Sequence, residues 1–174
     1  MKNYKELLSK INTFIFDVDG VLTDGSLTIT TNGEMLRTMN VKDGYALKAA
    51  LDSGYKIAII SGGTNEGVRN RLKALGVEFI YLGSHDKLKQ LNSFITSSNV
   101  GLKNILYMGD DIPDIPVLKI VGLSSCPQDA VNEVKSICNY VSNKNGGKGA
   151  VRDVIEQVMK IHEKWDGFNN AQMD

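Results

Sequence analysis

Residues 13–25 read TFIFDVDGVLTDG, a short apolar run followed by three aspartates spaced among glycines. Apolar runs of about four to six residues bounded by Gly, Asp or Ser are typical of strands buried on both faces of a sheet. Three further runs of this kind occur at residues 57–61, 79–82 and 105–109. We therefore predict four buried strands, each of which ends in polar residues.

Segments with helical spacing separate these runs. Apolar residues recur every three or four positions over 68–75 and 88–95, and again over 151–159, where they indicate an amphipathic helix. Strands that alternate with helices along a chain form a parallel sheet, and the helices cover its two faces. The expected fold is therefore α/β, a Rossmann-like parallel sheet with helices on both faces.

Residues 25–40 interrupt this alternation. Two extended segments flank Asn32-Gly33, and Asn-Gly is the strongest short-range signal for a hairpin. We predict a β-hairpin insert at about 25–40, after the first strand, and no separate cap domain. Because a lone two-stranded ribbon is marginally stable in water, the hairpin should pack on its own domain or on another subunit.

Length and composition fit one globular domain. The chain has 174 residues, so we predict one domain over 1–174, with a flexible tail at about 166–174. Lys and Arg number 20, as do Asp and Glu, so no overall field attracts nucleic acid or an anionic membrane. The sequence shows no apolar stretch long enough to span a bilayer, no apolar signal core and no CxxC spacing of its two cysteines. These features predict a cytoplasmic protein with free thiols and neither a membrane nor a nucleic-acid partner.

Chemically active residues follow all four predicted strands. In an open parallel sheet, ligands bind beyond the carboxyl ends of the strands, where the loops converge. Crowded carboxylates require a cation, and all-oxygen ligation suits Mg²⁺, whereas zinc would favour His or Cys ligands. Mg²⁺ beside a lysine, a serine and several aspartates matches phosphoryl transfer. In chain order the residues are Asp17, Asp19, Thr23 and Asp24; Ser61, Gly62 and Gly63; His85, Asp86 and Lys87; and Asp110, Asp111 and Asp114.

The first two aspartates suit a two-step reaction. Asp17 lies at the end of the first strand, and we assign it as the nucleophile that attacks phosphorus and forms an aspartyl-phosphate. Asp19 is assigned as the general acid and base, which protonates the leaving alkoxide and then deprotonates the attacking water. An isolated Asp-x-Asp is more often a solvated strand end, but here the other motifs follow in order.

These motifs resemble those of haloacid dehalogenase superfamily phosphatases. The matching segments are Asp17-Val-Asp19-Gly, Ile60-Ser61-Gly62, Lys87 and Gly109-Asp110-Asp111 with Asp114, and the resemblance spans about residues 14–154. DVDGVLTDG, the hairpin insert, residues 41–44 and GGKGAVRD at 146–153 are more narrowly similar to the 3-deoxy-D-manno-octulosonate 8-phosphate phosphatase subfamily of lipopolysaccharide sugar biosynthesis.

The resemblance implies a phosphoric monoester hydrolase with a defined metal site. It implies that Asp17, the main-chain carbonyl of Asp19 and Asp110 hold Mg²⁺. It also implies that Asp111 or Asp114 supports the metal shell or orients the lysine.

The resemblance further implies how the substrate is held. Ser61 and Lys87 would grip the transferring phosphoryl group. Many relatives carry Arg directly after the Ser/Thr-Gly pair, whereas this chain has Gly63. An ordinary surface charge is the alternative interpretation for Lys42, Asp43 and Arg69. The glycine-rich segment at 146–149 is either a flexible connection or a mobile basic loop. The candidate substrate contacts are Thr23, Lys42, Asp43, Gly62, Gly63, Arg69 and Lys148.

The short spacing between motifs bears on how the site is covered. Only 41 residues separate Asp19 from Ser61 and 25 separate Ser61 from Lys87, too few for a separate lid domain. The hairpin of a neighbouring subunit is the economical cover, and the resembled subfamily is similar in forming tetramers through that hairpin. We therefore predict a homotetramer with shared active sites.

Three alternatives remain open at this point. The substrate is either 3-deoxy-D-manno-octulosonate 8-phosphate or a nine-carbon ulosonate 9-phosphate or other phosphosugar, because one or two carbons change fit by only about 1–3 kcal/mol. A receiver-type phospho-accepting module also combines Asp, Mg²⁺, Ser/Thr and Lys, but it carries its acceptor Asp on a middle strand. A catalytically retired subunit would not require the intact aspartates and lysine.

Overall fold

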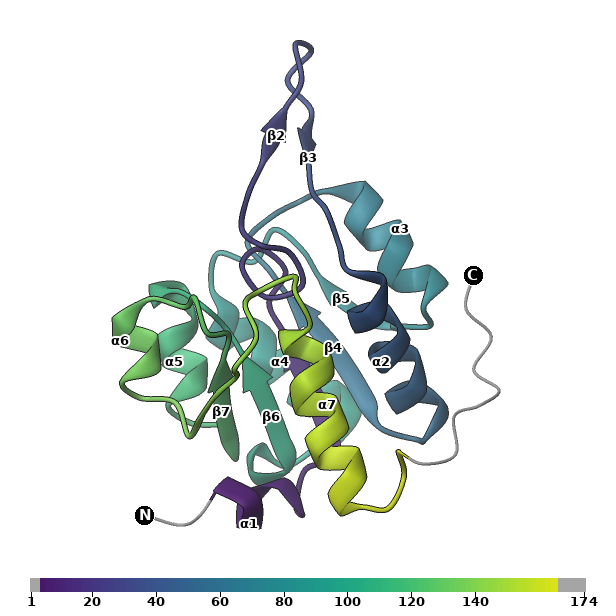
Figure 1. Cartoon of the computed structure of the whole chain (residues 1–174), viewed down its shortest axis with the longest axis vertical. Helices are drawn as coiled ribbons and strands as arrows, with labels where there is room; N and C mark the ends of the chain where they lie inside the picture. The colour runs from purple at the N-terminus through teal and green to yellow at the C-terminus, as the bar shows by residue number, and fades with distance from the viewer. Residues whose placement is uncertain (1–3, 166–174) are drawn as a thin grey trace.

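Six parallel strands form the central sheet of the computed structural model, which describes residues 4–165 (Figure 1). Their spatial order is β5-β4-β1-β6-β7-β8, so the first strand lies inside the sheet. The predicted α/β fold is confirmed. The strand bounds are β1 Thr13–Phe16, β4 Lys56–Ile60, β5 Phe79–Tyr81, β6 Ile105–Met108, β7 Leu123–Cys126 and β8 Tyr140–Val141.

The register of β1 places the loop after it at the middle of the carboxyl end of the sheet. Phe16 pairs with Ile59 of β4 on one side and with Met108 of β6 on the other. All four residues of β1 are buried, as expected for a strand with both faces covered. The chain therefore leaves the sheet at Asp17, between the ends of two neighbouring strands.

Helices cover both faces of the sheet. In Figure 1, α2 and α7 lie side by side in front of it. The side chains of β1 divide between the two layers, because Phe14 and Phe16 pack in one apolar core and Ile15 in the other. One face carries α1 (Tyr4–Leu8), α2 (Val41–Asp52), α3 (Glu66–Ala74) and α7 (Ala150–Ile161); the other carries α4 (Lys87–Ser98), α5 (Ile115–Leu118) and α6 (Asn132–Lys135). Short 3₁₀ turns lie at Leu102–Asn104 and Ile112–Asp114.

The predicted hairpin projects beyond the body of the sheet (Figure 1). Its strands, β2 (Thr28–Ile29) and β3 (Met35–Leu36), are antiparallel and only two residues long. Gly33 in the turn has φ +85°, a left-handed conformation that glycine adopts without a Cβ penalty. The apolar side chains of both strands are exposed, with Ile29 reaching 69%. The hairpin ladder is thus shorter than the 25–40 segment that contains it.

Within the described residues, the structure adds helices and strands that periodicity did not indicate: α1, α2, α5, α6, β7 and β8. Within residues 4–165, no helix combines the length and apolarity needed to cross a membrane. The predicted tail at 166–174 lies outside the described residues. That residues 1–174 form one domain stays a prediction.

Candidate active site

Asp17 and Asp110 extend from neighbouring strands into one cleft. Asp17 follows β1, and its N–H donates to the carbonyl of Met108 at the end of β6, 3.1 Å away. Asp110 follows the same end of β6, and both residues line a cleft of about 450 Å³. The topology therefore brings the predicted residues together as expected. The same cleft is lined by Asp19, Ser61, Gly62, Gly63, Lys87, Asp111 and Asp114.

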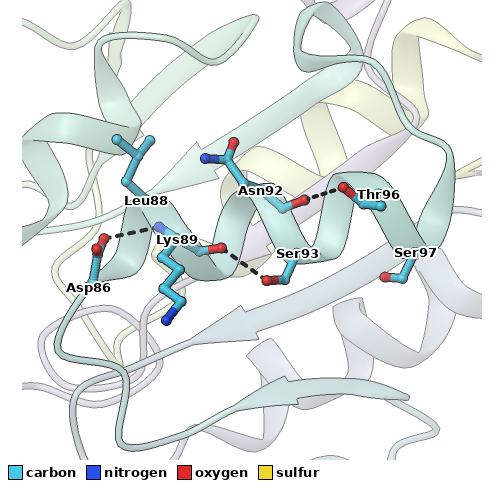
Figure 2. Close-up of a pocket in the computed structure, with 7 residues that line it drawn as sticks. All are labelled: Asp86, Leu88, Lys89, Asn92, Ser93, Thr96 and Ser97. Atoms are coloured by element: carbon cyan, nitrogen blue, oxygen red, sulfur yellow. Dashed lines mark hydrogen bonds between the residues drawn. The ribbon is translucent and has the colours of Figure 1, made fainter.

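Lys87 enters the cleft from the first turn of α4. Asp86 caps this helix by accepting a hydrogen bond from the N–H of Lys89 at 2.9 Å, as Figure 2 shows. The Lys87 side chain is 7% exposed, and its Nζ donates to Asp17 Oδ2 at 2.5 Å and to Asp114 Oδ1 at 2.6 Å. A helix N-terminus disfavours a cation, so the two carboxylates account for the position of this ammonium group. The groove drawn in Figure 2 shares no lining residue with the cleft.

Asp114 accepts hydrogen bonds from several residues around the cleft. Its Oδ1 accepts hydrogen bonds from Lys87 Nζ and from the hydroxyl of Tyr107, and its Oδ2 accepts from the N–H groups of Asp110 and Asp111 at 3.1 and 3.3 Å. An ionised carboxylate has about four acceptor sites, and the four donors occupy them. Asp114 and Tyr107 are fully buried. Asp114 therefore holds its neighbours in place.

The carboxylates outnumber the cation that faces them. Burial, followed by the charge of Asp114, raises the pKa of Asp17 from 3.8 to about 6. Burial, followed by repulsion from Asp114 and Asp17, raises the pKa of Asp110 from 3.8 to about 7. For Lys87, burial acts to lower the pKa, but the charges of Asp17 and Asp114 outweigh it and raise the pKa above its usual value. The site therefore carries more negative charge than its lysine balances.

This excess charge makes the cleft a candidate metal centre. Carboxylate oxygens of Asp17, Asp110 and Asp114 lie within 4.8 Å of one another. Because Asp114 is fully engaged, Asp17 and Asp110 are the side chains that could bind a divalent cation, and Mg²⁺ commonly takes one or two carboxylates. Gly20 packs so close that a Cβ there would lie 2.0 Å from Asp110 Oδ2. The Asp19 carbonyl as a third ligand stays a prediction.

Ser61 faces the same cleft from the end of β4. It is 2% exposed, and its N–H donates to the carbonyl of Tyr81 at 2.9 Å. Its Oγ accepts a hydrogen bond from the N–H of Gly63 at 3.3 Å. The hydroxyl proton of Ser61 is therefore available to an acceptor in the cleft.

Sequence reasoning missed the partner of Asp19. Arg37, just after β3, donates from Nε to Asp19 Oδ1 at 2.7 Å and from Nη2 to Asp19 Oδ2 at 3.0 Å. The contact joins residues 18 positions apart, and no local spacing rule signals it. Ser84 and His85 also line the cleft.

Two predicted substrate contacts, Thr23 and Asp43, make hydrogen bonds within the fold. Thr23 is fully buried, and its Oγ1 accepts from the N–H of Gly25 at 3.2 Å, which closes the loop after β1. Asp43 is 1% exposed and accepts from the N–H groups of Gly149 and Arg152, at the start of α7. Neither residue lines the cleft, and their roles as substrate contacts stay predictions.

Three predicted basic contacts also lie outside the cleft lining. Lys42 is exposed at the start of α2, and Arg69 donates to Glu66 and to the carbonyl of Ile80. Lys148 Nζ lies 3.5 Å from Asp24 Oδ2.

The glycine-rich loop that carries Lys148 is fastened to its surroundings. Gly147 donates to the carbonyl of Val21, and the Asn40 side chain donates to Gly147. Both interpretations of 146–149, a flexible connection and a mobile basic loop, stay predictions.

A parallel sheet with acidic residues after β1 and β6, a serine after β4 and a lysine at the start of α4 defines a haloacid dehalogenase-like hydrolase. A family model of that description matches residues 78–155. The chain is also 38% identical over 156 residues to 3-deoxy-D-manno-octulosonate 8-phosphate phosphatase of Salmonella typhi, which covers 90% of this chain and 83% of the relative. The chain belongs to this phosphatase family.

Solved structures agree with this assignment. The enzyme of the same name from Yersinia pestis superposes with a TM-score of 0.93 at 32% identity, covering 95% of this chain and 90% of that one. The Moraxella catarrhalis enzyme, solved with a magnesium ion, a phosphate ion and a KDO molecule, gives a TM-score of 0.92 at 32% identity and covers 97% of each chain.

Proposed function

We propose that this protein is a Mg²⁺-dependent phosphomonoesterase that removes phosphate from 3-deoxy-D-manno-octulosonate 8-phosphate through an aspartyl-phosphate. The observation that carries the proposal is the buried contact of Lys87 with Asp17, beside Asp110, in a cleft at the carboxyl end of the sheet. The magnesium, phosphate and sugar-acid ligands of the Moraxella relative support it. The cytoplasmic location stays a prediction.

In the first step, Asp17 acts as the nucleophile. A carboxylate oxygen of Asp17 attacks phosphorus, and the bond between phosphorus and the sugar oxygen breaks. Asp19 gives its proton to the departing alkoxide. The Ser61 hydroxyl and the Lys87 ammonium donate hydrogen bonds to phosphoryl oxygens, which offsets the charge that develops on them.

In the second step, water releases the phosphate. Asp19 accepts a proton from water as the water oxygen attacks phosphorus, and the bond to the Asp17 oxygen breaks. Inorganic phosphate leaves, and both aspartates return to their starting states. Asp114 does not react, and its four hydrogen bonds keep Lys87 and the Asp110 loop in position.

Asp17 and Asp110 would hold the Mg²⁺. When bound, Mg²⁺ supplies positive charge that lets an anionic phosphate approach a cluster of carboxylates. The fit rests on the excess of carboxylates over cations and on oxygen atoms within 4.8 Å of one another.

Phosphate release from a panel of sugar phosphates tests the proposal. We expect kcat/KM to be highest for the eight-carbon sugar acid, to require added Mg²⁺, and to vanish in Asp17→Asn while the variant stays folded. Near-normal turnover by Asp17→Asn would contradict the nucleophile assignment. Lys73→Gln, which removes an exposed charge of α3, is the matched control.

A nine-carbon ulosonate 9-phosphate is the second candidate substrate. It is favoured by a neighbouring groove of about 640 Å³ between the hairpin and the start of α3, which Gly63 helps to line. The same panel separates the two candidates by their relative kcat/KM values.

We further propose a homotetramer in which hairpins cover neighbouring sites. The exposed apolar side chains of the hairpin support this, since a two-stranded ribbon gains stability by packing. Size-exclusion chromatography with light scattering tests it, and a fully active monomer would contradict it. The residues concerned are Leu27, Ile29, Met35 and Leu36.

A further inference from the structure

His85 lines the cleft from the loop between β5 and α4. Two backbone hydrogen bonds fasten this loop to the loop after β4. The N–H of Gly83 donates to the carbonyl of Gly63 at 2.9 Å. The N–H of Ser84 donates to the carbonyl of Ser61, also at 2.9 Å. The main chain therefore holds His85 at a fixed place on the cleft wall, and its side chain is exposed there.

His85 differs from the other basic residues around the cleft. Among the residues that line it, His85 and Lys87 are the two whose side chains can carry a positive charge. Lys87 already donates to two carboxylates. Arg37, just outside the lining, donates from its three guanidinium nitrogens to Asp19 and to a backbone carbonyl. Within residues 4–165, the His85 imidazole forms neither a hydrogen bond nor an ion pair, so its nitrogen atoms are available to a ligand.

Both candidate substrates named above bring two anionic groups into the cleft. The phosphate ester meets Ser61 and Lys87, and the carboxylate lies at the other end of the carbon chain. A charge that loses its water without gaining a partner is costly, so the carboxylate requires hydrogen-bond donors of its own. A protonated imidazole offers two N–H donors, and hydrogen bonds between ionised groups are the strong ones.

We propose that His85 is a specificity residue, whose imidazolium binds the carboxylate of the ulosonate substrate. The inference rests on the proposed function, since it names the residue that distinguishes a sugar acid from other phosphate esters. The carboxylate is remote from the phosphorus atom, so this contact is equally strong before and during bond breaking. Loss of such a contact raises KM and leaves kcat unchanged. A residue that only supports the fold would instead affect every ester alike.

The test compares the sugar-acid phosphate with p-nitrophenyl phosphate, which has no carboxylate. We expect His85→Ala to raise KM for the sugar-acid phosphate about 10–100-fold, and to leave its kcat and both constants for p-nitrophenyl phosphate within about 2-fold. His85→Arg retains positively charged donors and should restore most of the loss. His85→Asp repels the carboxylate and should raise KM above that of His85→Ala. Lys89→Ala, which removes an exposed charge from the same helix turn outside the cleft, is the matched control.

Inhibition by the product measures the same contact without turnover of the sugar. The free eight-carbon sugar acid and its methyl ester are compared as competitive inhibitors of p-nitrophenyl phosphate hydrolysis. In the wild type, the ester should bind about 10–100-fold more weakly than the acid, whereas in His85→Ala the two should bind equally. A preference for the acid that survives His85→Ala, or equal weakening of both inhibitors, would overturn the inference.

The wild-type protein separates failure of this inference from failure of the proposed function. If the wild type hydrolyses the sugar-acid phosphate with Mg²⁺ and His85→Ala keeps the same KM, His85 does not bind the carboxylate, and the proposed function stands. An equal loss on p-nitrophenyl phosphate would also overturn the inference, because it would place the effect of His85 at the phosphate or in the fold. If the wild type hydrolyses neither ester, the proposed function fails and this inference fails with it.

Discussion

Lys87 and Asp17 are 70 positions apart in the sequence, yet 2.5 Å separates Nζ from Oδ2 in the interior of the cleft. The lysine reaches the aspartate from the start of α4, and the aspartate reaches the lysine from the end of β1. Both side chains are at least nine-tenths buried, so neither charge is screened by water. The contact therefore couples the stability of the fold to the chemistry of the site.

Loss of the Lys87 ammonium group should lower both the stability of the fold and the phosphatase activity. Lys87→Met leaves Asp17 and Asp114 without their cation, and breaking a buried pair in this way costs about 3–5 kcal/mol. We expect the free energy of unfolding, measured by urea denaturation, to fall by that amount. We also expect phosphate release to be lost. Lys89→Met, on the exposed side of the same helix turn (Figure 2), should leave both unchanged. Unaltered unfolding of Lys87→Met would show that the contact does not stabilise the fold.

Mg²⁺ binding should strengthen as pH rises through the raised pKa of Asp110. With a pKa of about 7 against an ordinary 3.8, the folded metal-free protein keeps a proton that the unfolded chain has released over this interval. The folded state then binds more protons than the unfolded state, so the stability of the metal-free protein falls as pH rises from about 4 to 7. Mg²⁺ competes with that proton and restores stability most at the upper end.

Thermal unfolding with and without Mg²⁺ measures this linkage. The stabilisation by Mg²⁺ should be small near pH 5 and large near pH 8, and Asp110→Asn should abolish the difference. Equal stabilisation at the two pH values would rule out Asp110 as the proton-linked ligand.

Gly20, in the loop after β1, lies close to Asp110, so we expect Gly20→Ala to weaken metal binding. The new Cβ would lie 2.0 Å from Asp110 Oδ2, so the carboxylate must move. The left-handed backbone at φ +79° adds a strain of about 1–2 kcal/mol. Gly54→Ala carries the same strain at φ +84° but has no atom within 4 Å of the new Cβ, which makes it a matched control. Titration calorimetry should find weaker Mg²⁺ binding in Gly20→Ala alone.

A substitution at Asp43 distinguishes a structural role of this residue from a role in binding substrate. Its two oxygens accept from the N–H groups of Arg152 and Gly149, at 2.8 and 3.2 Å. An amide has one acceptor oxygen, so Asp43→Asn leaves one buried donor unsatisfied and should lower the free energy of unfolding by about 1–3 kcal/mol. The kcat/KM of the folded variant should stay near that of the wild type. A selective rise in KM without loss of stability would favour the substrate-contact interpretation.

Apolar runs predicted the strands that are uniformly apolar and missed the strands that are not. β1, β4 and β6 are buried on both faces, and their sequences show it directly. β7 escaped prediction because Ser124 and Ser125 interrupt it, although both are buried. Their hydroxyls bond Asn139 and the carbonyl of Tyr107, which satisfies them in the interior.

The candidate site was predictable to the extent that strand ends determine it. Asp17 and Ser61 directly follow strands and Asp110 is the second residue after β6, so sheet topology alone brings them together. Arg37 and Tyr107 act through contacts whose partners are set by tertiary packing, and a sequence pattern does not encode them.

The adjacency of β1 and β6 also sets the time at which the site can form. As a nascent chain leaves the ribosome, Asp17 is synthesised early, while its neighbour Asp110 waits for the second half of the polypeptide. Until β6 docks against β1, the emerging chain holds an aspartate with no companion to complete the centre. The centre therefore cannot assemble before β6 has been synthesised and has paired with β1.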